Sequence, residues 1–189
     1  SVLYSGLING DTFSGTYTGA FNNANAGTSK TVTITPSYTG ADVSNYSVTD
    51  HSTITADIAV KALTATASAS NKTYDGTTTA TTTLTFSGLV GSETLGQTVG
   101  STFNNKNVGT GKTVTVNSIT LADGTGLAAN YSISPGQTTT ADITAKSLTV
   151  SGITASNKTY DATTTATLNT GSVTYTGLVS GDDFNGTYT

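Results

Sequence analysis

The sequence lacks cysteine, methionine and tryptophan, and all seven of its basic residues are lysines. Without cysteine, the chain can form neither disulfide bonds nor a thiol-based active site. Without methionine, it lacks the residue at which translation starts, so we expect it to be a piece of a longer protein. Tryptophan is the usual sugar-stacking residue, and its absence weighs against a carbohydrate site of the common kind.

Charged residues are also scarce, at 10% of the chain, with a formal net charge of −4 and a pI of about 4.5. Nucleic acids and anionic membranes attract basic proteins, so we expect this chain to bind neither. Its apolar runs are a few residues long, whereas a membrane-spanning helix needs about 20 apolar residues. We therefore expect no membrane contact within this piece.

The side chains that usually carry catalysis or bind metals are few and scattered. His51 is the only histidine and Glu93, in a Gly-Ser turn, the only glutamate. A catalytic triad or a zinc site needs several such groups together, so we expect His51 to lie in a solvated loop. Asp182 and Asp183 are adjacent. A glycosidase needs two acids aimed into one cleft, so we interpret Asp182 as a turn-capping residue instead. We expect no catalytic residues, no metal site and no cofactor.

Threonine, by contrast, makes up about a quarter of the chain, alongside nine tyrosines and 34% hydrophobic residues overall. This apolar content is too high for a disordered tail, so the chain should fold, with thin cores. Residues 30–35 place Val32 and Ile34 on one face and threonines on the other, which is the period of a half-buried strand. Similar segments and turn signals recur, and no amphipathic helix is found. We predict an all-β fold of elongated, antiparallel, sandwich-like domains.

Four stretches of the sequence occur twice. Each pair nearly matches residue for residue, and the separations are multiples of about 85 residues. The pairs are residues 71–81 and 157–167, 55–64 and 140–149, 21–34 and 103–116, and 1–18 and 172–189. A period of about 85 residues exceeds the 20 to 50 residues of solenoid repeats and matches a small autonomous domain.

The repeat divides the chain into tandem domains. We predict the C-terminal part of a first repeat in residues 1–60, a complete repeat in 61–145 and the N-terminal part of a third in 146–189. A permuted frame remains open, with units 1–85 and 86–171 followed by the overlap.

The most similar pair of stretches contains a short motif, which we interpret as structural. Its tyrosines can bury their rings while the hydroxyl finds a partner, and each aspartate can accept backbone N–H groups of the following turn. Because alanine replaces glycine in the second copy, we expect an ordinary right-handed or extended backbone at that position. The motif residues are Lys72, Tyr74, Asp75 and Gly76 in one copy, and Lys158, Tyr160, Asp161 and Ala162 in the other.

Lys-Thr-Tyr-Asp-Gly-Thr-Thr at residues 72–78, in a unit that closes on Thr-Ala-Asp-Ile-Thr-Ala-Lys-Ser-Leu at 140–148, resembles the YDG repeat. This repeat is related to MBG-type repeats and occurs in tandem in very large bacterial adhesins of the filamentous-haemagglutinin and biofilm-matrix kinds. The resemblance covers essentially the whole chain, and Ala162 is its one departure within the motif. It implies a stalk or spacer at the bacterial cell surface, without enzymatic activity.

Three functions compete at this point. The first is the extracellular stalk, whose partners are the neighbouring repeats of the same chain. The second is a binding module, in which rows such as Thr31, Thr33 and Thr35 present hydroxyls to ice or glycans. The third is a filament subunit that associates with its own kind by strand exchange through exposed sheet edges.

Overall fold

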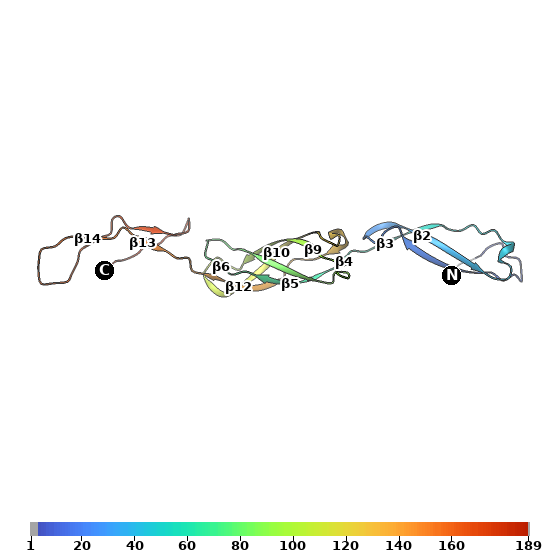
Figure 1. Ribbon diagram of the computed structural model, residues 1–189, viewed down its shortest axis with the longest axis horizontal. Helices are drawn as coiled ribbons and strands as arrows, with labels where there is room; N and C mark the ends of the chain where they lie inside the picture. The colour runs from blue at the N-terminus through green and yellow to red at the C-terminus, as the bar shows by residue number, and fades with distance from the viewer. Residues whose placement is uncertain (1–3, 189) are drawn as a thin grey trace. The chain divides into compact units, whose positions relative to one another are not determined.

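The computed structural model describes residues 4–188 (Figure 1). The only helical segments in this part are two 3-10 turns, η1 (Val43–Asn45) and η2 (Ala128–Asn130), and all other regular structure is β. The predicted all-β, sandwich-like class is confirmed. The strands are β1 (Ser14–Phe21), β2 (Gly27–Thr39), β3 (Thr53–Ile58), β4 (Lys61–Ala62), β5 (Thr64–Ala69), β6 (Lys72–Thr73), β7 (Thr79–Ala80), β8 (Thr82–Ser87), β9 (Leu95–Phe103), β10 (Gly109–Asp123), β11 (Tyr131–Ser132), β12 (Thr138–Thr144), β13 (Thr149–Ser151), β14 (Thr154–Ala155), β15 (Leu168–Asn169) and β16 (Thr174–Thr176).

The chain divides into two compact units that are not continuous in sequence. Unit 1 comprises the described part of Ser1–Leu63, with Val90–Leu95 and Asp123–Ser132. Unit 2 comprises Thr64–Leu89, Gly96–Ala122 and the described part of Ile133–Thr189.

Unit 1 contains a three-stranded antiparallel sheet in the order β1-β2-β3. Its central strand, β2, shows the alternation expected from the sequence, because Val32 is buried while Thr31 and Thr33 are exposed. Unit 1 also holds a two-residue pair of β4 and β11, in which Tyr131 lies opposite Lys61. That pair is parallel, which the sequence pattern did not predict.

Unit 2 has two layers. A five-stranded sheet in the order β6-β12-β10-β9-β7 forms one layer, and the antiparallel pair β5-β8 packs beside it, with β5 in contact with β12 (Figure 1). The sheet is mostly antiparallel, but β6 pairs with β12 in parallel. This is a sandwich-like arrangement with a small second layer.

The core of unit 2 is small and built from both layers. On β10, Val114 and Val116 are 0% and 1% exposed, because every second residue of this strand points inward. Phe103 from β9, Ile143 from β12 and Leu84 from β8 are similarly buried.

The three-stranded sheet of unit 1 repeats the register of three strands in unit 2. Gly27 of β2 pairs with Ile58 of β3, and Gly109 of β10 pairs with Ile143 of β12. In both sheets a register shift follows directly. The repeat seen in the sequence is therefore also a repeat of strand pairing.

The bulge at this register shift is built the same way twice. In unit 1 the Ser29 backbone N–H donates to Asp57 at 2.7 Å, and in unit 2 the Gly111 N–H donates to Asp142 at 2.8 Å. Ser29 and Gly111 both have a left-handed backbone, with φ of 50° and 58°. The carboxylate holds this strained turn closed even where the residue is serine.

Candidate functional site

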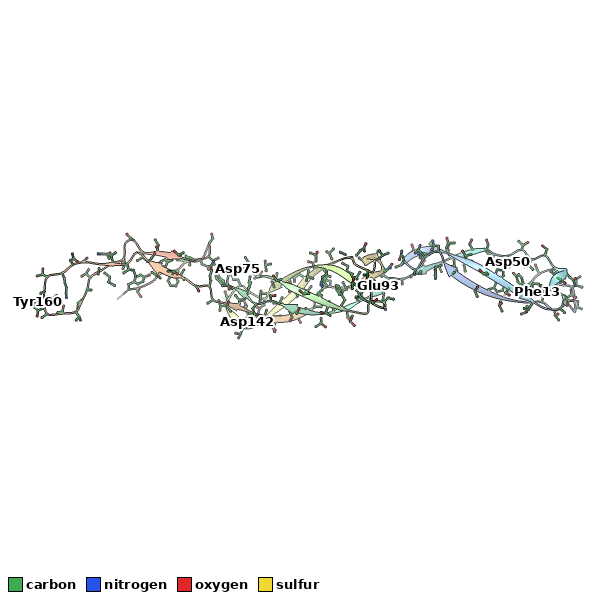
Figure 2. The ribbon with its side chains drawn as sticks, in the orientation of Figure 1. Phe13, Asp50, Asp75, Glu93, Asp142 and Tyr160 are labelled. Carbon is green, nitrogen blue, oxygen red and sulfur yellow. The ribbon has the colours of Figure 1, made fainter. Side chains whose placement is uncertain are left out.

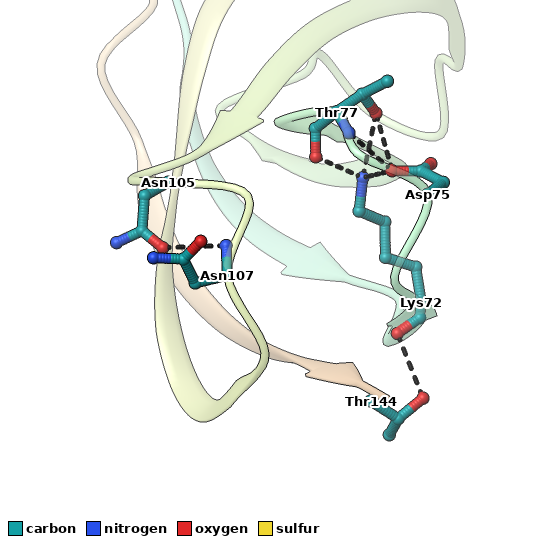
Figure 3. A network of polar contacts seen from close by, with 6 residues as sticks. All are labelled: Lys72, Asp75, Thr77, Asn105, Asn107 and Thr144. Atoms are coloured by element: carbon teal, nitrogen blue, oxygen red, sulfur yellow. Dashed lines mark hydrogen bonds and ion pairs between the residues drawn. The ribbon is translucent and has the colours of Figure 1, made fainter. Parts of the chain in front are cut away.

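The repeated motif forms a compact polar network at Asp75 (Figure 3). One carboxylate oxygen, Oδ1, accepts hydrogen bonds from Lys72 Nζ at 2.8 Å and from the backbone N–H and hydroxyl of Thr77, both at 2.9 Å. Lys72 Nζ also donates to the Thr77 carbonyl at 2.8 Å. The turn-capping role predicted for Asp75 is confirmed, and Lys72 adds a charge to it.

The second copy has the same geometry. Asp161 Oδ1 accepts from Lys158 Nζ at 2.9 Å, from the Thr163 N–H at 3.0 Å and from the Thr163 hydroxyl at 2.9 Å. Lys158 Nζ donates to the Thr163 carbonyl at 2.9 Å. Because the network closes over six residues of local sequence, both copies form it whatever surrounds them.

The backbone prediction for the turn is wrong. Gly76 has φ of 79° and Ala162 has φ of 56°, so both lie in the left-handed region. A left-handed alanine costs about 1 kcal/mol, because its Cβ crowds the neighbouring carbonyl. The three hydrogen bonds to Asp161 hold the turn in this shape and offset the strain. Alanine is therefore tolerated at this position, and the difference between Gly76 and Ala162 did not reveal the left-handed backbone.

Both carboxylates are held in the ionised form. The pKa of Asp75 is lowered to about 2. The largest cause is the hydrogen bond from Lys72, followed by those from the Thr77 backbone N–H and hydroxyl. Lys158 and Thr163 lower the pKa of Asp161 in the same way. An acid that is already charged and bonded has no proton to donate at neutral pH, so this network suits a structural role.

The motif also ties the start of a repeat to its last strand. The Asn71 side chain accepts the Asp142 backbone N–H at 2.7 Å, and the Tyr74 N–H donates to the Thr144 carbonyl at 2.9 Å. Lys72 contributes its carbonyl, which accepts the Thr144 hydroxyl at 3.3 Å (Figure 3). In unit 2 the motif therefore fixes the end of β12.

The two motif tyrosines have different surroundings. Tyr74 is half-buried against the cluster that contains Phe103 and Ile143. Tyr160 is 91% exposed (Figure 2), so its expected burial is wrong. Tyr74 packs against residues of β9, β10 and β12, whereas in the part of the chain that the structure describes Tyr160 lies outside any strand and has no such cover.

Two acid–tyrosine pairs form a second repeated feature, which the sequence interpretation missed. In unit 1 the Tyr46 hydroxyl donates to Asp11 and accepts the Ile8 backbone N–H at 2.9 Å. The Tyr131 hydroxyl donates to Glu93 and accepts the Val90 N–H at 3.1 Å. The carboxylates raise the pKa of both tyrosines.

A signal for these pairs was present in the sequence. Asp11 and Glu93 are 82 residues apart, and Tyr46 and Tyr131 are 85 residues apart, so acid and tyrosine recur together in the repeat frame. Asp182 stands at the next acid position. Its carboxylate contacts the Tyr74 hydroxyl at 3.0 Å and Lys106 at 3.6 Å, rather than capping its own turn as predicted.

The threonine rows are short. On β2, Thr33 lies opposite Thr53 of β3 on one side and Ala20 of β1 on the other. Thr31 lies opposite Thr55. The hydroxyl rows on this sheet therefore cover two strands.

Among residues 4–188, no group of three or more histidines, cysteines or acids is placed to hold a metal ion. His51 is exposed, as expected. Within the same range no helix has the length and apolar character needed to cross a membrane.

The family model described as the YDG domain matches three successive stretches, residues 1–56, 59–141 and 144–189. The chain belongs to the YDG domain family. Neither the curated proteins nor the solved structures contain a match to it. The second YDG match contains both the Asp75 network and the Glu93–Tyr131 pair, so the two features described above belong to one YDG repeat.

Proposed function

We propose that these YDG repeats are structural spacers of a secreted or cell-surface bacterial adhesin, which extend the molecule for adhesion or biofilm formation. The observation that carries the proposal concerns the ends of the repeat in unit 2. β5 begins at Thr64, and the chain then runs to β6, where Lys72–Thr73 pair in parallel with Ile143–Thr144, the last residues of β12. A run of about nine residues at about 3.3 Å each spans about 30 Å.

Separated ends make a repeat useful as a spacer. When a chain enters a domain at one place and leaves it about 30 Å away, each added copy contributes its own length. A domain with adjacent ends would instead let neighbouring copies fold back on one another. The partners of each repeat are then the repeats before and after it in the chain.

The polar groups of the motif support the same function. The Asp75 and Asp161 carboxylates are each bonded to a lysine and to a threonine of their own turn. Copying this motif copies a stabilised turn, and it adds no free nucleophile or acid. The extracellular and adhesin parts of the proposal rest on the resemblance of the repeated motif to adhesin repeats.

Insertion of additional repeats tests the spacer role. Zero, one, two or three further copies of residues 61–145 are inserted after residue 145 of the full chain, and the maximum dimension is measured by small-angle X-ray scattering. We expect a constant increase of about 30 to 40 Å per copy. A dimension that grows with the cube root of the mass, as for a compact globule, would contradict the proposal.

A further inference from the structure

The connection between the first and second repeats is very short. The last strand of the first repeat, β3, ends at Ile58, and β4 of the second repeat begins at Lys61. Only Ala59 and Val60 lie between them. The YDG matches agree, because the first ends at residue 56 and the second begins at residue 59. By itself, such a connection would act as a hinge between neighbouring repeats.

A second contact joins the same two repeats at residues far apart in sequence. The Asn130 side-chain oxygen accepts the backbone N–H of Ala26 at 2.8 Å, and the Asn130 amide group donates to the Asn25 side-chain oxygen at 3.3 Å. Asn25 and Ala26 belong to the hairpin loop between β1 and β2, whereas Asn130 belongs to η2 of the second repeat. Accordingly, Val90–Leu95 and Asp123–Ser132 fall in the same compact unit as β1, β2 and β3.

The hairpin loop is held in shape by its own residues. Asn23 Oδ1 accepts the Asn25 backbone N–H at 3.0 Å and Lys30 Nζ at 2.6 Å. The corresponding loop of the second repeat closes in the same way, with Asn105 accepting the Asn107 N–H at 3.0 Å (Figure 3). A loop that is already ordered loses little conformational entropy when it binds a partner.

Asn130 is likewise held in place by its own repeat. The next residue, Tyr131, is 7% exposed, and its hydroxyl is bonded to Glu93 and to the Val90 N–H. Tyr131 also pairs with Lys61 at the start of the second repeat. The Asn130 side chain therefore extends from a fixed backbone toward the loop of the first repeat.

Both halves of the Asn130 contact recur in the repeat frame. Residues 45–47 repeat the Asn-Tyr-Ser sequence of residues 130–132. Residues 104–108 repeat the Asn-rich loop of residues 22–26. In the first repeat the loop precedes β2 and Asn45 follows it, and β10 separates the two halves in the second repeat in the same way. Each of these repeats thus carries the loop and the asparagine near opposite ends of one long strand, which suits head-to-tail joining.

The two junctions between repeats enclose corresponding pockets of about 280 Å³ each. Each pocket is lined by a residue of the loop and by a valine and an acid of the following repeat, namely Ala26, Val90 and Glu93 in the first and Val108, Val179 and Asp182 in the second. At the second junction the Lys106 ammonium of the loop lies 3.6 Å from the Asp182 carboxylate. The loop of one repeat therefore lies against the same part of the next repeat at both junctions.

We propose that each YDG repeat binds the Asn-rich loop of the repeat before it through the asparagine of its Asn-Tyr-Ser segment, so that successive repeats are joined at two points and their junction resists bending. The connection at Ala59 and Val60 is one point, and the Asn130 contact is the other. Two separate attachments remove rotations that a single connection allows. The use of this stiffness rests on the proposed spacer function, because a stiff junction lets each repeat add its full length. The contact itself does not depend on that function.

Two alanine variants of the full chain form a matched pair for the test. Asn130→Ala removes both hydrogen bonds of the contact. Asn45→Ala removes the same side chain from the same Asn-Tyr-Ser sequence, at the other end of β2 from Ala26. Hydrogen exchange of the Ala26 amide is followed by NMR. We expect this amide to exchange about tenfold faster in Asn130→Ala, because it loses its hydrogen bond, and at an unchanged rate in Asn45→Ala.

Pulsed electron paramagnetic resonance between two spin labels measures the stiffness itself. Because the chain lacks cysteine, labels can be attached specifically through Thr31→Cys on β2 and Thr98→Cys on β9, which replace exposed threonines. We expect a narrow distance distribution in the labelled chain and in its Asn45→Ala variant, and a broad one in Asn130→Ala. Asn130→Asp keeps an oxygen that can accept the Ala26 N–H, so its distribution should stay narrow.

The outcomes separate the contact from the spacer function. A broad distribution in the labelled chain without further substitution, or equal Ala26 exchange in the two alanine variants, would overturn the proposal. The labelled chain decides the matter even where a variant does not fold. If its distribution is broad while scattering still shows a constant gain per inserted copy, the contact fails and the spacer function stands. A narrow distribution together with cube-root growth would support the contact and contradict the spacer function.

Discussion

The side chain of Gln97 occupies both backbone hydrogen-bonding groups of Leu84. Its Oε1 accepts the Leu84 N–H at 3.1 Å, and its Nε2 donates to the Leu84 carbonyl at 2.7 Å. Leu84 lies on β8 and Gln97 on β9, so this side-chain amide links the two layers of unit 2. It bonds Leu84 in the way that the backbone of an additional strand would. The counterparts of Gln97 in the other two copies are Gly15 and Gly186.

Removal of this amide should destabilise unit 2. Gln97→Ala leaves the N–H and carbonyl of the buried Leu84 without their partner, and we expect a loss of about 2 kcal/mol in the free energy of unfolding. Urea denaturation followed by circular dichroism measures it. Thr98→Ala, at the exposed neighbouring position, serves as the control and should change stability by less than about 0.5 kcal/mol. Equal effects of the two substitutions would contradict the bridging role.

The Asp75 network should make stability depend on pH in the acid range. Its pKa is about 2 in the folded chain and 3.8 ordinarily, so the ionised form is favoured by folding. The stabilisation is therefore fully present above about pH 4 and is lost as the pH falls toward 2. Urea midpoints measured between pH 2 and pH 5 should decline for the wild type.

Asp75→Asn is the matched variant for this pH dependence. It should flatten the acid decline and lower the midpoint at pH 7, since the amide cannot pair with the Lys72 ammonium. Parallel pH profiles of variant and wild type would refute the assignment.

The left-handed turn predicts unequal effects of alanine at two glycines of unit 2. Gly76 has φ of 79°, and an added Cβ would lie 2.9 Å from Val179 Cγ1. Gly111 has φ of 58° and open space around an added Cβ. We expect Gly76→Ala to cost about 1 to 2 kcal/mol and Gly111→Ala about 1 kcal/mol or less, by thermal and urea unfolding. A larger cost at Gly111 would show that the surroundings of Gly76 do not matter.

The predicted repeat boundaries can be tested by limited proteolysis with a protease of broad specificity, such as proteinase K. Lys146 lies between β12 and β13 and is outside any strand, whereas Lys61 pairs with Tyr131 in β4-β11. We expect the first cut near Lys146 and a slower one near Lys61, mapped by mass spectrometry. Protection at both lysines, with earlier cuts near residues 85 and 171, would favour the permuted frame.

Much of the fold follows from local sequence. The alternation of valine and isoleucine with threonine places β2 and β10 as strands with one buried face, because successive strand residues point to opposite sides. The Asp75 and Asp161 turns likewise depend on residues within five positions of one another. Such features form wherever their short sequence occurs, which is why both copies of the motif look alike.

Other features depended on parts of the chain far apart in sequence. The link from Gln97 to Leu84, the pairing of Tyr131 with Glu93 and the two parallel strand pairs join segments that no local pattern connects.

The sequence by itself determined the strands, the repeat period and the motif turn, because these depend on the order of residues along the chain. Only the tertiary structure decided burial. Tyr74 and Tyr160 stand in nearly identical sequence, yet one is half-buried and the other is 91% exposed. The physical reason is that a side chain loses its contact with water only when other strands pack over it, and β9, β10 and β12 pack over Tyr74 alone.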